Sequence, residues 1–235
     1  MTTTIMQRLK KLTSALLIAL STAVAFTACN DSDSGSSATD NYTALVTYNG
    51  PTAGSDYFEF RNLGDAEPVI FHCPAAVNAT QFKAGQRMII LFTPIGHKAD
   101  QSGPITLQSY QPVPTITVEQ ATSAEAQDAN AEMRVNAINR SGHWINLEAT
   151  VSIYRDRKWK MLADESTTGT GTVDLYITTD AVSGPAGYSG SVLSSYNISS
   201  VWANPAVNAV RVHINNTEPG GKKVFEFKKS GSGAQ

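Results

Sequence analysis

The chain has 235 residues and a slightly acidic balance, with 18 Lys and Arg against 20 Asp and Glu. A protein that binds nucleic acid needs a basic surface to contact phosphate, so this balance argues against nucleic acid as a partner. The length is sufficient for one large domain or two small ones with a buried core.

Residues 1–28 predict an export signal of the lipoprotein type. Three basic residues near the start precede an apolar run of twelve residues, 15–26. This run is too short to cross a membrane as a helix, which takes about 20 residues. Small residues then lead directly into Cys29. We expect the signal to be removed and Cys29 to become the lipid-bearing first residue of the mature protein. The alternatives are an ordinary signal peptide with a chance cysteine and a buried core helix.

Residues 29–41 predict a flexible tether, because they are rich in Ser, Asp and Gly and cannot bury enough apolar surface to become ordered. Asp31 and Asp33 allow two interpretations. They resemble a signal for export to the outer leaflet of the outer membrane, or they simply keep the linker soluble. The expected location is the outer membrane, with the protein lipid-anchored at its periplasmic face or at the cell surface.

Removal of residues 1–28 would leave 15 basic and 20 acidic residues, a net charge of −5. This charge argues against strong electrostatic docking on anionic lipid. The second cysteine of the chain is Cys73. Because Cys29 would carry lipid, we expect no disulfide, and we expect Cys73 to be buried as a small hydrophobe.

The first half of the mature chain predicts a small β-barrel, which we place at residues 42–118. Short apolar or alternating runs are separated by Gly, Pro, Asn and Asp, which is typical of strands and turns. Five strands in such a short stretch favour a barrel. They are expected at 42–48, 57–61, 68–72, 88–92 and 105–110, with a further short strand at 115–118.

The second half, residues 119–230, predicts a β-sandwich. The clearest strand is 144–154, where five apolar residues alternate with polar ones. Residues 120–133 have helical composition without an apolar stripe, which indicates a linker or a short surface helix. The remaining strands are expected at 133–138, 159–163, 172–179, 195–198, 209–214 and 223–227, with a Gly-, Ser- and Pro-rich loop at 183–191 and a disordered tail at 231–235.

The order and spacing of several segments resemble the NigD-like lipoproteins over nearly the whole mature chain. These segments are YTALVTY (42–48), KAGQRMIILFTP (83–94), GHWINLEATVSIY (142–154), VDLYITTD (173–180), SYNIS (195–199) and VRVHINN (210–216). The resemblance implies an all-β chain, with an N-terminal OB-like barrel followed by a C-terminal β-sandwich. It also implies a link to bacteriocin immunity, without a mechanism or functional residues. One departure is the short Leu63-Gly64-Asp65 segment, where we expect an Asp-Asp-Gly type of turn.

Four histidines could in principle hold a metal: His72, His97, His143 and His213. None lies within ten residues of another, whereas a zinc site favours ligands at close spacing or on one surface. We therefore interpret them as ordinary strand and loop residues, and we predict neither a metal nor a cofactor.

No catalytic arrangement is evident in the sequence. Residues 187–190 approach a nucleophile elbow but fail its spacing, so we interpret them as a loop. No phosphate-binding or dinucleotide-binding glycine motif occurs. Asp164 and Glu165 are adjacent, and adjacent carboxylates do not flank a sugar bond, so we interpret them as a solvated turn.

The predicted barrel raises nucleic acid as a partner by analogy, with Tyr57, Phe58 and Phe60 on one strand. Phe58 and Phe60 share a face that is better explained as core, and we predict no nucleic-acid partner. We expect a non-enzymatic envelope lipoprotein that binds or protects against another macromolecule, such as an envelope protein or a peptide toxin. The alternative is a surface glycan-binding accessory protein or a hydrolase, which a deep polar cleft between the domains would favour.

Replacement of Cys29 by alanine should abolish incorporation of labelled palmitate, because the thiol is the expected site of lipid attachment. Metabolic labelling of the envelope fraction followed by capture of the protein measures this incorporation. Wild-type protein is the control, and equal labelling of the two proteins would contradict the assignment.

Overall fold

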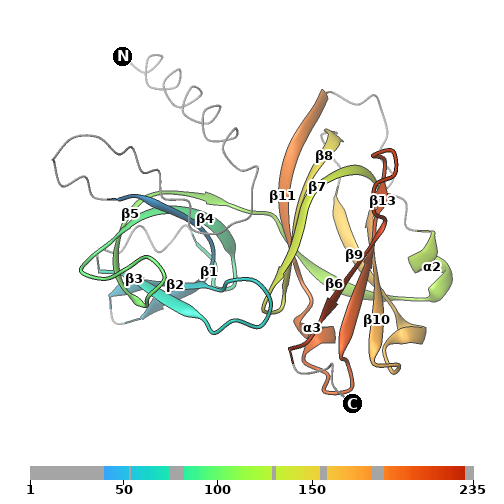
Figure 1. Ribbon diagram of the computed structural model, residues 1–235, viewed down its shortest axis with the longest axis horizontal. Coiled ribbons are helices and arrows are strands. Elements are labelled where there is room, and N and C mark those ends of the chain that lie inside the picture. Colours follow the sequence, from blue (N-terminus) through green and yellow to red (C-terminus); the bar gives the residue numbers. More distant parts are fainter. Residues whose placement is uncertain are drawn as a thin grey trace.

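The computed structural model describes residues 40–52, 54–74, 82–128, 131–153, 158–180 and 188–230. The predicted signal peptide, Cys29, nearly all of the tether and the tail lie outside these residues. The described part of the chain is almost entirely β, in two domains (Figure 1), which confirms the expected fold class.

The N-terminal domain is a closed five-stranded barrel with the order β1-β2-β3-β5-β4. Strand β3 pairs with β5 in parallel, and the other pairs are antiparallel. A closed five-stranded barrel agrees with the OB-like barrel that the resemblance implies. The strands are β1 (Tyr42–Thr52), β2 (Ser55–Phe60), β3 (Val69–Cys73), β4 (Arg87–Pro94) and β5 (Gly103–Pro112).

Aromatic side chains fill the barrel. Strand β2 alternates strictly, and Phe58 and Phe60 point into the core, as the sequence predicted. Tyr48 is fully buried, and its hydroxyl donates a hydrogen bond to Asp56 Oδ1 at 2.8 Å. Burial, together with this bond, raises the pKa of Tyr48 to about 12, so the phenol keeps its proton. Cys73 is buried in the same core, as expected.

The C-terminal domain is built on one nine-stranded sheet with the order β13-β7-β8-β11-β6-β9-β10-β12-β14. Its strands are β6 (Thr115–Ala121), β7 (Glu132–Ser141), β8 (Trp144–Ile153), β9 (Trp159–Asp164), β10 (Thr172–Thr179), β11 (Tyr188–Asn197), β12 (Ala209–His213), β13 (Asn215–Asn216) and β14 (Val224–Lys228). Three short helical segments connect them: α2 (Ser123–Gln127), the 3-10 turn η2 (Glu165–Thr167) and α3 (Ser199–Trp202).

Strand β6 is the corner at which this sheet folds over. Residues 115–117 pair in parallel with β11, and residues 118–121 pair in parallel with β9. Strands β13, β7, β8 and β11 therefore form one layer, and β9, β10, β12 and β14 form the other. Side chains of both layers, such as Ile145 on β8 and Leu175 on β10, share a single buried core. The domain is thus the expected sandwich.

Two predicted boundaries differ from the structure. The expected end of the barrel at residue 118 falls inside β6, because this strand pairs only within the sandwich sheet, and the division lies at Val113–Pro114. The loop expected at 183–191 overlaps β11, which begins at Tyr188 because it pairs with β8 as far as Ile153. In both cases pairing with strands that are distant in sequence, and not the local composition, determines the extent of the strand. Within the described residues, no helix is long and apolar enough to span a membrane.

The short segment between β2 and β3 docks the barrel on the sandwich. The Gly64 N–H donates to the Arg140 carbonyl at 2.8 Å, and the Gly142 N–H donates to the Gly64 carbonyl at 2.7 Å. Gly64 has a φ of +73°, in the left-handed region that favours glycine. The segment that departs from the expected turn therefore forms part of the contact between the domains.

Arg140, on β7, completes this contact. Its guanidinium donates to both carboxylate oxygens of Asp65, at 2.7 and 2.9 Å, and to the carbonyls of Gly142 and Lys228. It also lies 4.3 Å from the ring centroid of Trp202. The Arg140 side chain is only 3 % exposed. The Asp65 carboxylate and the backbone carbonyls, rather than water, therefore compensate its charge.

Arg87, at the start of β4, is a second buried arginine between the domains. It donates to Thr47 Oγ1 at 3.0 Å and, across the junction, to Asn146 Oδ1 at 3.2 Å, and it lies over Trp144. No carboxylate of a described residue forms an ion pair with Arg87, and its Nε has no hydrogen-bond partner among those residues. Burial lowers the pKa of Arg87 to about 9, which nearby Glu59 only partly offsets.

The two arginines should respond differently to replacement by methionine. Arg140→Met should lower the free energy of unfolding by about 3 kcal/mol, because it leaves the Asp65 carboxylate without its cation. Arg87→Met is the matched control and should change it by less than about 1 kcal/mol, because it removes a buried charge that has no carboxylate partner. Urea denaturation at pH 7 measures both, and equal losses would contradict the distinction.

Asp65 should make stability depend on pH. The hydrogen bonds from Arg140 and from the Ser230 N–H hold the pKa of Asp65 at about 2, below its ordinary value of 3.8. The folded state therefore gains stability above about pH 4 and loses it as the pH falls towards 2. Asp65→Asn should lower the free energy of unfolding by roughly 2 kcal/mol at pH 7 and by almost nothing at pH 2. Urea titrations across this range test it, and a constant difference between the two proteins would refute it.

Candidate functional site

A connected group of titratable side chains lies on the outer surface of the sandwich, on β10 and β12. Alternate residues of both strands point into the core, so Asp174 and Tyr176 on β10 and Arg211 and His213 on β12 point outward. The two strands are parallel neighbours, with Asp174 opposite Arg211 and Tyr176 opposite His213. We refer to these four residues as the outer-face cluster.

Asp174 is the centre of the outer-face cluster. Its Oδ2 accepts a hydrogen bond from Arg211 Nη2, and its Oδ1 lies against His213 Nε2, both at 2.7 Å. The Asp174 N–H donates to Thr167 Oγ1 of η2 at 3.0 Å. The His213 ring stacks on Tyr176 with a centroid distance of 4.4 Å and an angle of 9°. Each side chain is therefore held by another, and the cluster is preorganised.

Exposure within the outer-face cluster is uneven. The Asp174 side chain is 10 % exposed, whereas those of His213 and Arg211 are 28 % and 43 % exposed. Burial, and secondly the charge of Asp174, raises the pKa of Tyr176, so its hydroxyl keeps its proton at neutral pH. The outer-face cluster thus presents the Arg211 guanidinium, the His213 imidazole and the Tyr176 phenol to an incoming molecule. The Asp174 carboxylate that holds Arg211 and His213 is buried.

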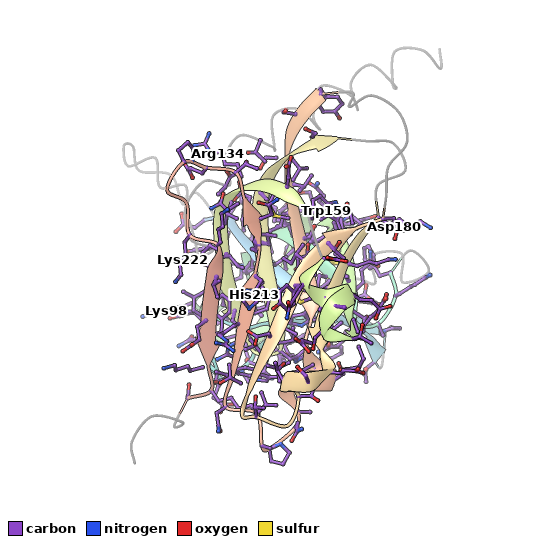
Figure 2. The ribbon with its side chains drawn as sticks, turned by 90° about the vertical axis from the view of Figure 1, so that its right-hand side faces the viewer. Lys98, Arg134, Trp159, Asp180, His213 and Lys222 are labelled. Atoms are coloured by element: carbon purple, nitrogen blue, oxygen red, sulfur yellow. The ribbon has the colours of Figure 1, made fainter. Side chains whose placement is uncertain are left out.

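This surface faces away from the barrel. Figure 2 shows it from the side opposite the barrel, with His213 between Lys222 on one side and Trp159 and Asp180 on the other. An Asp–His pair can serve as a catalytic base when a nucleophile lies within hydrogen-bond reach. No hydroxyl or thiol of a described residue is hydrogen-bonded to the His213 ring.

The other histidines are dispersed, and each has a local packing role. His72 stacks on Tyr57, both nitrogens of His97 lie near backbone carbonyls, and the His143 ring lies beside Trp144. Within the described ranges, no group of three or more His, Cys, Asp or Glu side chains could hold a metal ion.

The solvated turn expected at Asp164 and Glu165 is wrong for Asp164. Its side chain is buried and accepts hydrogen bonds from the Ser123 hydroxyl and from the N–H and hydroxyl of Ser166. These bonds lower its pKa and cap η2. Asp164 therefore joins α2, β9 and η2, and it has a structural role.

Two surface hollows lie away from the outer-face cluster. The larger, of about 460 Å³, is at the junction of the domains between residues 83–86 and the Val113–Thr115 connection, and Lys83 is its one charged lining residue. A smaller hollow of about 190 Å³ lies beside α3. Neither hollow contains a pair of carboxylates, the arrangement that glycoside hydrolysis requires.

The members of the outer-face cluster lie in segments 173–180 and 210–216, but the sequence did not identify them as a site. Both strands alternate between apolar and polar residues, and this alternation indicated which side chains point outward. The outward polar positions are those of Asp174, Tyr176, Arg211 and His213. Nothing local indicated that these two strands, which are distant in sequence, pair in parallel.

No protein-family model matches the chain, and no curated protein does. Solved structures share its fold. A protein of unknown function from Bacteroides vulgatus has 14% identity and a TM-score of 0.64, with 83% of this chain and 94% of that chain covered. A protein from Parabacteroides distasonis, provisionally described as toxin-related, has 15% identity and a TM-score of 0.64, with 82% and 96% covered.

A protein from Bacteroides fragilis, provisionally described as a lipoprotein, has 14% identity and a TM-score of 0.53, with 81% of this chain and 99% of that chain covered. A NigD-like immunity protein from Bacteroides caccae has 15% identity and a TM-score of 0.49, with 78% and 90% covered, and this weaker likeness adds no argument. At these identities the comparisons establish the fold, and they agree with the barrel and sandwich that the resemblance implied.

Proposed function

We propose that this chain is an envelope lipoprotein, anchored in the outer membrane through Cys29, that binds another macromolecule and does not act as an enzyme. The export signal and the cysteine that follows it support the anchor. The fold shared with a protein provisionally described as a lipoprotein is compatible with this location.

The outer-face cluster is the observation that carries the proposal. Its polar groups are preorganised on an open sheet surface, and the buried carboxylate of Asp174 holds Arg211 and His213 in place. Rigid Arg and Tyr side chains contribute strongly to binding between proteins because they lose little freedom on contact. The side-chain exposure of Arg211 and His213 leaves both groups able to contact a partner.

The partner that fits this surface best is a polypeptide with an acidic or hydrogen-bonding segment. Arg211 can donate to a carboxylate, and the stacked rings of Tyr176 and His213 provide a flat platform beside it. A peptide toxin or an envelope protein has this chemistry. The neighbour provisionally described as toxin-related is compatible with the first of these.

Loss of Arg211 and His213 together should reduce partner recovery at least tenfold in a pull-down from envelope extract. The wild-type chain and Lys160→Ala should recover the partner equally, because Lys160 lies on the same layer and pairs with Asp180 outside the cluster. Circular dichroism controls for folding. Equal recovery by all three proteins, or no partner with any of them, would overturn the proposal. Specific binding on a glycan array that the double variant retains would favour the glycan-binding alternative.

A further inference from the structure

Strand β11 has an edge that the rest of the sheet leaves uncovered. Strand β8 pairs with β11 along its whole length, from Tyr188 to Asn197. On the other side, β6 pairs with residues 195–197 alone, and β11 extends well beyond β6 in Figure 1. Residues 188–194 therefore form an edge strand in the middle of the sheet order.

The orientation of the backbone identifies the groups on this edge. The Ser195 N–H donates to the Pro114 carbonyl on the β6 side. Because successive residues of a strand alternate in direction, Ser189, Ser191 and Leu193 present their N–H and C=O groups to the same side. No backbone group of another described residue bonds to them there. Three residues thus offer donors and acceptors to an added strand.

The β14 edge and the β11 edge of this sheet are protected very differently. Strand β14, at one end of the sheet, is flanked by Lys222, Lys223, Lys228 and Lys229. Lysine on an edge strand prevents pairing with another chain. Residues 188–194, with the sequence YSGSVLS, contain no charged residue and no proline. The β11 edge lacks the features that prevent strand addition.

We propose that the β11 edge pairs with the same edge of a second copy of this chain, as an antiparallel homodimer with its two-fold axis at Ser191. Ser191 would face Ser191 of the partner subunit, and Ser189 would face Leu193 of the partner subunit. Each of these pairs exchanges two backbone hydrogen bonds. A two-fold interface must be self-complementary, and this strand is, because its edge-facing groups are symmetric about Ser191.

Charge and exposure favour a second copy as the occupant. The expected mature chain has a net charge of −5, but residues 188–194 carry no charge, so the two paired strands themselves place no like charges opposite each other. The nearest carboxylate is that of Glu148 on the neighbouring β8, which accepts a hydrogen bond from Ser191 Oγ at 3.2 Å. Tyr188 is 69 % exposed, the highest value among the exposed large hydrophobic side chains of the described residues. In the proposed register it lies diagonal to Val192 of the partner subunit, which would cover part of its ring. The proposed dimer interface lies on the layer that contains β11, and the outer-face cluster lies on the other layer. The outer-face cluster therefore stays accessible in the dimer.

Cysteine cross-linking in intact cells tests the register. Ser191→Cys should form a disulfide-linked dimer, because residues opposed in a hydrogen-bonded pair have Cα atoms about 5.5 Å apart, within disulfide range. Ser189→Cys is the matched control, on the same strand and the same face. Its Cα would lie roughly 13 Å from that of its counterpart, too far to link. Non-reducing electrophoresis of the envelope fraction separates the products. Monomer with both variants, or equal cross-linking of both, would overturn the proposal.

Sedimentation of the detergent-solubilised full chain provides a second measurement. Wild type and Ser191→Ala should be dimers, because both keep the N–H at position 191. Ser191→Pro should weaken the dimer at least tenfold, since proline has no N–H to donate across the edge while the bonds to β8 come from the neighbouring residues. Thermal unfolding confirms that the variants are folded. A wild-type monomer at all concentrations would refute the proposal even if Ser191→Pro fails to fold.

Discussion

The ion pair between Arg140 and Asp65 is the contact on which the arrangement of the two domains depends. It forms where three segments meet: the loop between β2 and β3, the end of β7 and the residues that follow β14. The Arg140 guanidinium is almost removed from water, whereas the Asp65 side chain stays 29 % exposed, and the backbone bonds of Gly64 hold the loop that brings the two charges together. Arg87 has no such carboxylate, and it fixes the position of the barrel through Asn146 and Trp144 at a cost in desolvation.

Local patterns predicted most of the strands but not their partners. The long alternation at 144–154 became β8, and the apolar run at 88–92 became the centre of β4, because each pattern reports burial of the same residues that show it. The assignment of β6 to the sandwich, the early start of β11 and the pairing of β10 with β12 depend on strands distant in sequence. The outer-face cluster was missed for this reason, since its members come together only through that parallel pairing.

The sandwich separates two kinds of surface. The layer of β7, β8 and β11 carries the β11 edge, where backbone groups are available, and the other layer carries the outer-face cluster, where side chains are. A strand edge accepts any extended chain without charge, whereas preorganised side chains select a partner by its chemistry. The proposed self-association and the proposed recognition of a different molecule would therefore use separate surfaces of one sandwich.

The path of the chain through the barrel also determines how the protein resists a pulling force. The chain enters at Tyr42, opposite Phe92 of β4, and leaves after Pro112, which is opposite Met88 of the same strand. Entry and exit thus lie towards opposite ends of the β4 ladder. A force between the expected anchor and a molecule held by the sandwich is directed along the strands, and all the hydrogen bonds of the ladder share the load. This shear geometry would suit the proposed role, in which a membrane-tethered protein holds a partner.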